Sequence, residues 1–213
     1  MNADTDFVEV LAKSFPELSR REVELFTRYY RLVLKWNDRL HLTTVTTPRA
    51  FVPRHLGEAI FTGNRILRGI DQFWDIGSGA GIPGIPVAIL RPQMYVRLVE
   101  ANRRKALFLE EVATELQLHR VKVINARFET LGGFSAHACL AARAVEKMEE
   151  VVRGIVRQGG EAAQILILGG AQLEGVMGAA GWRLERYRLP ASTNRWLFEL
   201  VNAKTQGRKD AKE

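Results

Sequence analysis

Residues 75–86 read DIGSGAGIPGIP and combine residue types that suit a bound ligand. In this stretch Gly77, Gly79 and Gly81 alternate shortly after Asp75, the acid that ends an apolar run. Because glycine has no Cβ, it adopts positive φ and lets a ligand lie against the main chain. The two prolines suit the first turn of a following helix, whose free N–H groups favour an anionic group. The stretch therefore predicts a preformed loop for binding a ligand.

Two classes of nucleotide cofactor are compatible with this loop. A dinucleotide pattern, G-x-G-x-x-G, can be read from Gly79 but fails from Gly77, because the sixth position is then Ile82. The pattern D-x-G-x-G-x-G from Asp75 adds an acid, which suits the amino group and sulfonium of S-adenosylmethionine, held directly or through water. Glu100 ends the next predicted strand, where a carboxylate can accept the ribose hydroxyls of either cofactor. The sequence favours S-adenosylmethionine and leaves a nicotinamide-binding oxidoreductase as an alternative.

Short apolar or β-rich runs, which predict strands, alternate with helix-like stretches from residue 72 onward. The strand-like runs are QFWDI, MYVRLVE, RVKVIN, HACLAAR and AQILILG. Strands that alternate with helices predict a parallel sheet, in which ligands bind at the carboxyl ends of the strands. At the end of the chain, GWRLERYRL and RWLFELVNA flank PASTN and predict an antiparallel hairpin. We therefore expect an α/β, doubly wound sheet of about seven strands.

The first part of the chain is expected to be helical and to contain no strand of any length. Ser19 and Glu22 form a capping-box pattern at the start of a helix. That helix places an apolar stripe at helical spacing, formed by Val23, Phe26, Tyr30, Val33 and Trp36. A second helix is expected over residues 49–60, and Pro53 should restrict its first turn.

Composition narrows the class of protein further. The chain has 213 residues, 46% of them hydrophobic, which suits one α/β domain with a small extension. It has no apolar run near the roughly 20 residues of a membrane helix, and its N-terminus does not resemble a secretory signal, so we expect a cytoplasmic protein. A single cysteine excludes an internal disulfide, and we expect no metal site. The net charge of +7, carried mainly by arginine, favours a nucleic-acid partner.

Several segments together resemble one known family. DIGSGAGIPGIPVAI, WNDRLHLTTVTTPRAFVPRHL, LVEANRRKALFLEEV, NARFETL, AARAV and NRWLFELV resemble segments of the bacterial 16S rRNA guanine-N7 methyltransferases, the glucose-inhibited division protein B family. The resemblance implies a Rossmann-like class I methyltransferase sheet. It also implies a division into an N-terminal helical extension (residues 1–62), an S-adenosylmethionine-dependent methyltransferase domain (63–203) and a charged tail (204–213).

The implied activity is methyl transfer from S-adenosylmethionine to N7 of a guanine in the 530 loop of 16S rRNA. Guanine N7 carries a free lone pair and no proton, so the reaction needs no general base. Positioning of the reacting atoms should therefore dominate catalysis. The implied partner is 16S rRNA or the 30S ribosomal subunit, whereas the sequence does not indicate an oligomeric state.

The resemblance assigns roles to individual residues. The cofactor-binding set is Gly77, Gly79, Gly81, Ile82, Glu100, Phe128, Glu129 and Arg143. Arg143, at the end of the fourth predicted strand, is also the candidate catalytic residue, with an ion pair to Glu146 as the alternative. The RNA or substrate set is Arg54, His55 and Arg195. Alternative roles remain open: core packing for Phe128, a solvated carboxylate for Glu129, a structural histidine for His55 and a surface charge for Arg195.

Three residues depart from the family pattern. His41 replaces an asparagine, Ala142 replaces a serine, and Gly169 stands where a lysine is common. The last change leaves open a paralogous methyltransferase with another substrate, or an RNA-binding module that has lost catalysis. Cys139 lies near the fourth strand, as does the nucleophile of cytosine-C5 methyltransferases, but we expect it to be buried and inert.

Overall fold

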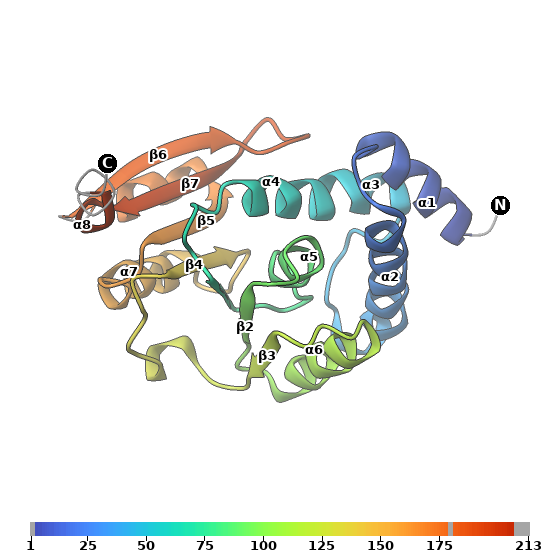
Figure 1. The fold of residues 1–213 in the computed structure, drawn as a ribbon, viewed down its shortest axis with the longest axis horizontal. Coiled ribbons are helices and arrows are strands. Elements are labelled where there is room, and N and C mark those ends of the chain that lie inside the picture. The colour runs from blue at the N-terminus through green and yellow to red at the C-terminus, as the bar shows by residue number, and fades with distance from the viewer. Residues whose placement is uncertain (1–2, 179–180, 207–213) are drawn as a thin grey trace.

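The computed structural model describes residues 3–178 and 181–206, in which a seven-stranded sheet is flanked by helices (Figure 1). The strands are β1 (Gln72–Ile76), β2 (Tyr95–Val99), β3 (Val121–Ile124), β4 (Ala138–Arg143), β5 (Gln164–Gly170), β6 (Trp182–Arg188) and β7 (Arg195–Asn202). Their order in the sheet is β3-β2-β1-β4-β5-β7-β6. The pairs formed among β1 to β5 are all parallel, whereas β7 is antiparallel to both β5 and β6. The predicted doubly wound sheet and its C-terminal hairpin are confirmed.

The helical part of the chain precedes and separates these strands. The N-terminal helices are α1 (Ala3–Ser14), α2 (Arg20–Leu40), α3 (Pro48–Phe51), the π-helical turn η1 (Val52–Gly57) and α4 (Glu58–Asn64). The later helices are α5 (Gly84–Leu90), α6 (Arg103–Glu115), η2 (Phe128–Thr130), α7 (Met148–Gln158), η3 (Ala171–Val176) and α8 (Ala203–Gln206). The predicted tail lies largely outside the described residues. The predicted division at residue 62 falls within α4 and stays a prediction.

Helix α2 begins at the expected capping box. Ser19 caps the helix through its side chain, and the Glu22 carboxylate accepts the Ser19 backbone N–H at 2.7 Å. Phe26 and Tyr30 of the predicted stripe are buried, as is Tyr29 beside them. The Tyr29 hydroxyl donates to the carbonyl of Ala80 at 2.6 Å, which ties α2 to the glycine loop. The buried face of α2 therefore supports the loop directly.

The expected helix over residues 49–60 is present as a longer run that includes η1. Pro53 has no N–H to donate, so the regular hydrogen-bond pattern cannot continue through this point. A π-helical turn is the local result, and such turns often occur at functional sites. This turn carries Arg54 and His55, two of the predicted substrate-binding residues.

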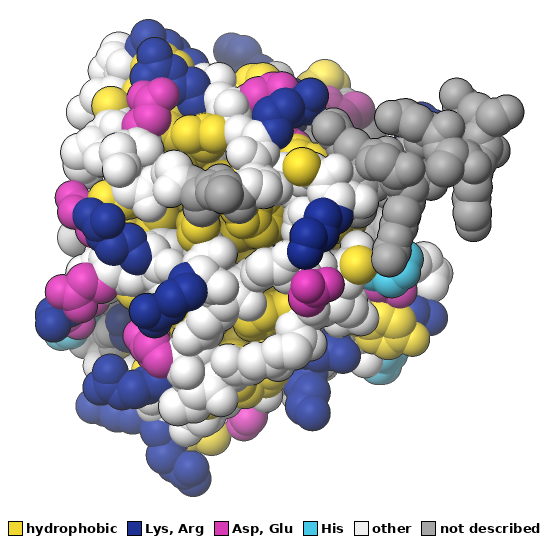
Figure 2. Space-filling view, turned by 90° about the vertical axis from the view of Figure 1, so that its left-hand side faces the viewer, with side chains coloured by type: hydrophobic (Ala, Val, Ile, Leu, Met, Phe, Trp, Pro, Cys, Tyr) yellow, Lys and Arg dark blue, Asp and Glu magenta, His cyan; other side chains and the backbone are white. Residues whose placement is uncertain are grey.

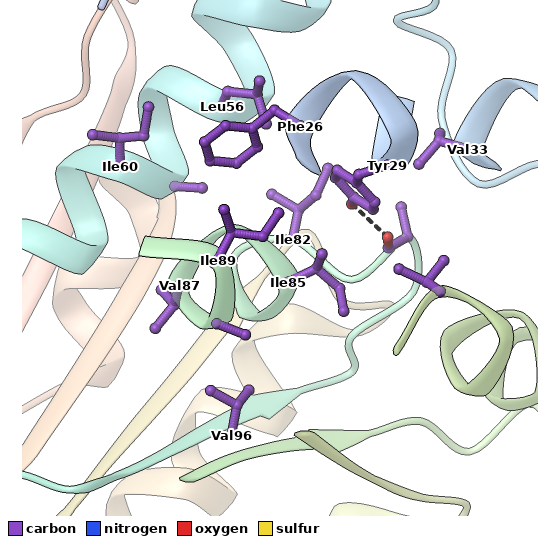
Figure 3. Packing of buried hydrophobic residues seen from close by; sticks show 14 of the residues in the cluster. Phe26, Tyr29, Val33, Leu56, Ile60, Ile82, Ile85, Val87, Ile89 and Val96 are labelled. Carbon is purple, nitrogen blue, oxygen red and sulfur yellow. Dashed lines mark hydrogen bonds between the residues drawn. The ribbon is translucent and has the colours of Figure 1, made fainter. Parts of the chain in front are cut away.

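The two faces of the sheet are covered by separate apolar clusters. Side chains alternate between the faces of a strand, so Leu166 packs in one cluster and its neighbour Ile167 in the other. The first cluster contains residues of α2, α4, α5 and α6. Figure 3 shows Ile89 of α5 facing Phe26 of α2, with Val96 of β2 on the other side of α5. The N-terminal helices and the sheet thus share one core.

Candidate active site

The glycine loop joins β1 to α5 in a conformation that requires glycine. Gly77, Gly79 and Gly81 have φ angles of 69°, 53° and 88°, in the left-handed region. A Cβ on Gly77 would lie 2.7 Å from Cγ2 of Val145, so the backbone there passes close to the segment after β4. The backbone N–H groups of Gly77 and Ser78 both donate to the carbonyl of Val99 at the end of β2. The loop is therefore fixed against two neighbouring strands.

A cavity of about 640 Å³ lies beside this loop at the carboxyl ends of the parallel strands. This volume is within the range of small-molecule sites. Eight of the predicted site residues line it, namely His55, Gly77, Gly79, Ile82, Glu100, Phe128, Glu129 and Arg143. Gly81, Arg54 and Arg195 are not among the lining residues. A Cβ on Gly81 would instead meet Ile85 at 2.7 Å, so this glycine serves the packing of α5.

Glu100 is held rigidly in the cavity wall. Its Oε2 accepts the N–H of Gly79 and its Oε1 accepts the N–H of Asn102, each at 2.8 Å. The Glu100 carbonyl accepts a bond from the side-chain amide of Asn125. An ionised carboxylate has about four lone-pair positions, so two backbone bonds leave others for a ligand. Glu100 can therefore accept further hydroxyl groups without moving.

Asp75 supports the loop and does not line the cavity. It is 1% exposed, and its Oδ2 accepts the N–H of Gly84 at 3.0 Å. Its Oδ1 is buried and has no hydrogen-bond partner among the described residues. Burial raises the pKa of Asp75 to about 7, although the bond from Gly84 and the nearby Ser78 hydroxyl act in the opposite direction. Asp75 therefore does not face the cavity directly, and its role in the structure is to hold the loop.

Phe128 and Glu129 both line the cavity. Phe128 is 6% exposed and stacks on Phe134, with ring centroids 5.9 Å apart, while Glu129 is exposed. Phe128 belongs both to the apolar core and to the cavity wall. Core packing and a ligand contact are therefore compatible roles for this ring.

A buried carboxylate that the sequence interpretation did not single out, Glu58, does not line the cavity but holds Arg143, which does. It is fully buried, and its Oε2 accepts a bond from Nε of Arg143 at 2.9 Å. Arg195 donates two bonds to the same carboxylate, both at 3.0 Å, and Arg54 lies 3.7 Å from it. The carboxylate partner of Arg143 is thus Glu58, and not Glu146. The available sequence signal was the i, i+4 spacing of Arg54 and Glu58.

His55 joins this cluster to the segment between α2 and α3. Its Nδ1 lies 2.8 Å from a guanidinium nitrogen of Arg143, and its Nε2 lies 2.7 Å from the Thr43 hydroxyl. His55 is 5% exposed, and burial together with the charge of Arg143 lowers its pKa to about 3. The imidazole is therefore neutral at physiological pH. The structure brings His55 and Arg143 together in the cavity wall and adds Thr43, which sequence reasoning missed.

The residues that depart from the family pattern have local explanations. His41 ends α2 with a φ of 47°, a conformation that asparagine and histidine both tolerate better than most residues. A Cβ at position 169 would lie 2.2 Å from Cδ1 of Leu173, so this leucine fills the space where a side chain would begin. Cys139 is fully buried and outside the cavity, and burial raises the pKa of its thiol well above the ordinary value. Nothing in the structure explains Ala142.

The sheet order and the cavity at its carboxyl edge define the class I methyltransferase fold. Its solved neighbours include the precorrin-6y C5,15-methyltransferase of Geobacter metallireducens, with a TM-score of 0.53 and 14% identity, covering 68% of this chain and 87% of that one. They also include a mutant of MtNAS in complex with S-adenosylmethionine, with a TM-score of 0.58 and 20% identity, covering 90% of this chain and 82% of that one. At these identities the likeness shows the fold alone.

Sequence comparison identifies the family. Residues 22–179 match GidB, described as rRNA small subunit methyltransferase G, and the chain belongs to this family. A relative named ribosomal RNA small subunit methyltransferase G from Xanthomonas campestris pv. campestris is 36% identical over 74% of each chain. A protein of the same name from Xanthomonas oryzae pv. oryzae is 41% identical over 62% of this chain and 60% of its own length. The match thus spans less than two thirds of that relative. The predicted family is confirmed.

Proposed function

We propose that this protein transfers a methyl group from S-adenosylmethionine to N7 of a guanine in the 530 loop of 16S rRNA. The observation that carries the proposal is the cavity, because its wall combines the glycine loop and the fixed carboxylate of Glu100 with Arg143, which belongs to a buried arginine cluster. The loop and Glu100 suit an adenosine cofactor, and Arg143 suits an anionic nucleotide. Membership of the GidB family supports both assignments.

The residues present fit S-adenosylmethionine. The open backbone at Gly79, where a Cβ would meet only the carbonyl oxygen of Gly77 at 3.8 Å, leaves room for a ligand against the loop. Glu100 has lone pairs free for two ribose hydroxyls, Phe128 borders the adenine, and Ile82 packs against the cofactor. When bound, the cofactor supplies the electrophilic methyl group. No residue of the chain has to form a covalent bond to substrate.

The chemical work of the chain is positioning. Guanine N7 is nucleophilic without loss of a proton, so the protein has to align N7 with the methyl group in a water-poor cavity. Arg143 lies at the end of β4 in the cavity wall, fixed by Glu58 on one side and His55 on the other. We assign Arg143 the role of binding the target nucleotide next to the cofactor. Arg54 and Arg195 add positive charge next to Arg143, because both also contact Glu58.

The charge of the arginine cluster favours RNA beside Arg143. Three arginines face one carboxylate and a neutral histidine, so the cluster keeps two uncompensated positive charges. Arginine binds phosphate bidentately, and such contacts weaken as salt rises. The face formed by β6, β7 and α7 differs, because basic and acidic side chains are interspersed over the described residues drawn in Figure 2. We therefore place the RNA at the cavity and not on that face.

The partner we propose is 16S rRNA, free or within the 30S subunit, and the proposed location is the cytoplasm. No helix among the described residues is long and apolar enough to cross a membrane. Within the same residues, no group of three or more His, Cys, Asp or Glu side chains could hold a metal ion.

The test is methyl incorporation from labelled S-adenosylmethionine into 30S subunits that lack the modification. We expect one methyl group per subunit, located by mass spectrometry at N7 of a guanine in the 530 loop. A label found elsewhere would favour the paralogue with another substrate, and binding of S-adenosylhomocysteine without any turnover would favour the non-catalytic RNA-binding module. Calorimetry that detects NAD and not S-adenosylhomocysteine would reject the proposal in favour of an oxidoreductase.

A further inference from the structure

Four side chains form a continuous hydrogen-bonded chain from the buried core to the cavity. Glu58 accepts from Arg143, Arg143 contacts Nδ1 of His55, and Nε2 of His55 contacts the Thr43 hydroxyl. The heavy-atom distances are 2.9, 2.8 and 2.7 Å. Thr43 itself lines the cavity and is half-buried. The chain therefore ends at a hydroxyl that a ligand can reach.

The direction of each hydrogen bond follows from the chemistry of arginine. A guanidinium carries only donors, so Nδ1 of His55 must be the acceptor of its bond with Arg143. A neutral imidazole with an unprotonated Nδ1 carries its proton on Nε2. That N–H then donates to Thr43. The arginine thus fixes the tautomer of His55, and the tautomer fixes the role of the threonine oxygen.

The Thr43 hydroxyl can still donate one hydrogen bond. Its oxygen accepts the bond from His55 and a second bond from the backbone N–H of Val45 at 3.0 Å. A hydroxyl has two acceptor lone pairs and one donor proton, so both lone pairs are occupied. The part of the chain that the structure describes offers no acceptor for the remaining proton. In the cavity, Thr43 can therefore donate a hydrogen bond but cannot accept one.

We propose that Thr43 is a specificity-determining residue that donates to O6 of the target guanine, with His55 as the positioning residue that imposes this direction. The proposal rests on the proposed function. Guanine presents two acceptors, N7 and O6, on the edge that receives the methyl group, whereas adenine presents N7 beside an amino donor. A hydroxyl whose lone pairs are both occupied can pair with O6 but not with the adenine amino group. Thr43 thus selects guanine over adenine.

The first test compares Thr43→Val, which keeps the shape and removes the hydroxyl, with Thr43→Ser, which keeps the hydroxyl. An unpaired acceptor left in a site costs about 1–3 kcal/mol, so Thr43→Val should lower kcat/KM for 30S subunits by about 5-fold to 150-fold. Thr43→Ser should stay within about threefold of the wild type, which is a small free-energy change. Discrimination against 30S subunits that carry adenine at the target position should fall in Thr43→Val. The melting temperature controls for the lost Val45 contact.

The possible results separate this inference from the proposed function. Full activity and full discrimination in Thr43→Val would overturn the role of Thr43. Weaker binding of S-adenosylhomocysteine in calorimetry, with an unchanged KM for RNA, would also overturn it, because the acceptor would then belong to the cofactor. If the wild type methylates no guanine N7 in 16S rRNA, the proposed function itself fails.

A second measurement does not depend on activity. The ¹⁵N chemical shifts of the imidazoles report which nitrogen carries the proton, and the four histidines of the chain can be assigned with a His55→Gln variant. We expect His55 to be the neutral tautomer with its proton on Nε2 between pH 5 and pH 8. A proton on Nδ1, or a doubly protonated ring in this range, would contradict the direction of the hydrogen bonds and overturn the inference.

Discussion

Replacement of Glu58 by glutamine should destabilise the protein and also disorganise the cavity. The carboxylate is fully buried and accepts three charge-assisted bonds, one from Arg143 and two from Arg195. The side chains of Arg143 and Arg195 are only 9% and 16% exposed, so solvent does little to replace the lost partner. Removing one partner of a buried ion pair costs about 3–5 kcal/mol. A protein of this size melts about 2–4 °C lower for each kcal/mol, so the expected decrease is about 10 °C.

Glu199→Gln is a matched control for this experiment. Glu199 is 5% exposed and pairs with Arg65 at 2.9 Å, but neither residue lines the cavity. Both variants should melt at lower temperature in calorimetry. Well below the melting point, only Glu58→Gln should lose methyl transfer, because only it frees Arg143. Equal activity of the two variants, or an unchanged melting temperature for Glu58→Gln, would refute the claim that this carboxylate positions the arginines.

Three further outcomes can be checked. Gly77→Ala should abolish binding of S-adenosylhomocysteine in calorimetry, because its Cβ would lie 2.7 Å from Val145, whereas Gly133→Ala, with a similar φ of 75° but open space, should bind normally. The raised pKa of Asp75, about 7, means that the folded state keeps a proton that the unfolded state loses near pH 4, so stability falls as pH rises from 4 to 7. Urea unfolding should show this loss, a few kcal/mol, relative to Asp75→Asn, and parallel pH profiles would contradict it. Cys139→Ala should keep full methyl transfer, since the thiol is buried outside the cavity, and an inactive variant would restore the nucleophile interpretation.

The features that the sequence predicted well are those set by local physics. The glycines at 77, 79 and 81 adopt positive φ as predicted, because glycine has no Cβ and can make the sharp turn that follows a strand. The apolar runs from residue 72 onward became the strands of the sheet, since each is short and bounded by turn-forming residues. The capping box at Ser19 also formed as expected. Each of these depends on neighbours within a few residues.

The arginine cluster could not be predicted in the same way. Glu58 is the acidic residue of a predicted helix, and most acids on helices are solvated. Its partners Arg143 and Arg195 lie 85 and 137 residues further along the chain, at the last residue of β4 and the first residue of β7. These two residues lie at the same edge of the sheet, next to Glu58 of α4, only because of the strand order β4-β5-β7 and the antiparallel direction of β7. Thr43 was missed for a related reason, because its importance depends on the hydrogen bond that the buried His55 makes to it.

We expect the cluster to link the binding of the proposed RNA partner to the stability of the protein. Three arginines around one carboxylate repel one another, and Arg54 remains 40% exposed at the edge of the group. Like charges held together destabilise the folded state unless an anion joins them. A polyanion that binds the folded protein, and not the unfolded chain, raises the melting temperature, and the increase grows with the logarithm of its concentration above the dissociation constant. The charge imbalance that weakens the free protein is therefore the same feature that favours a bound phosphate, and Glu58 limits that cost because it offsets one of the three charges.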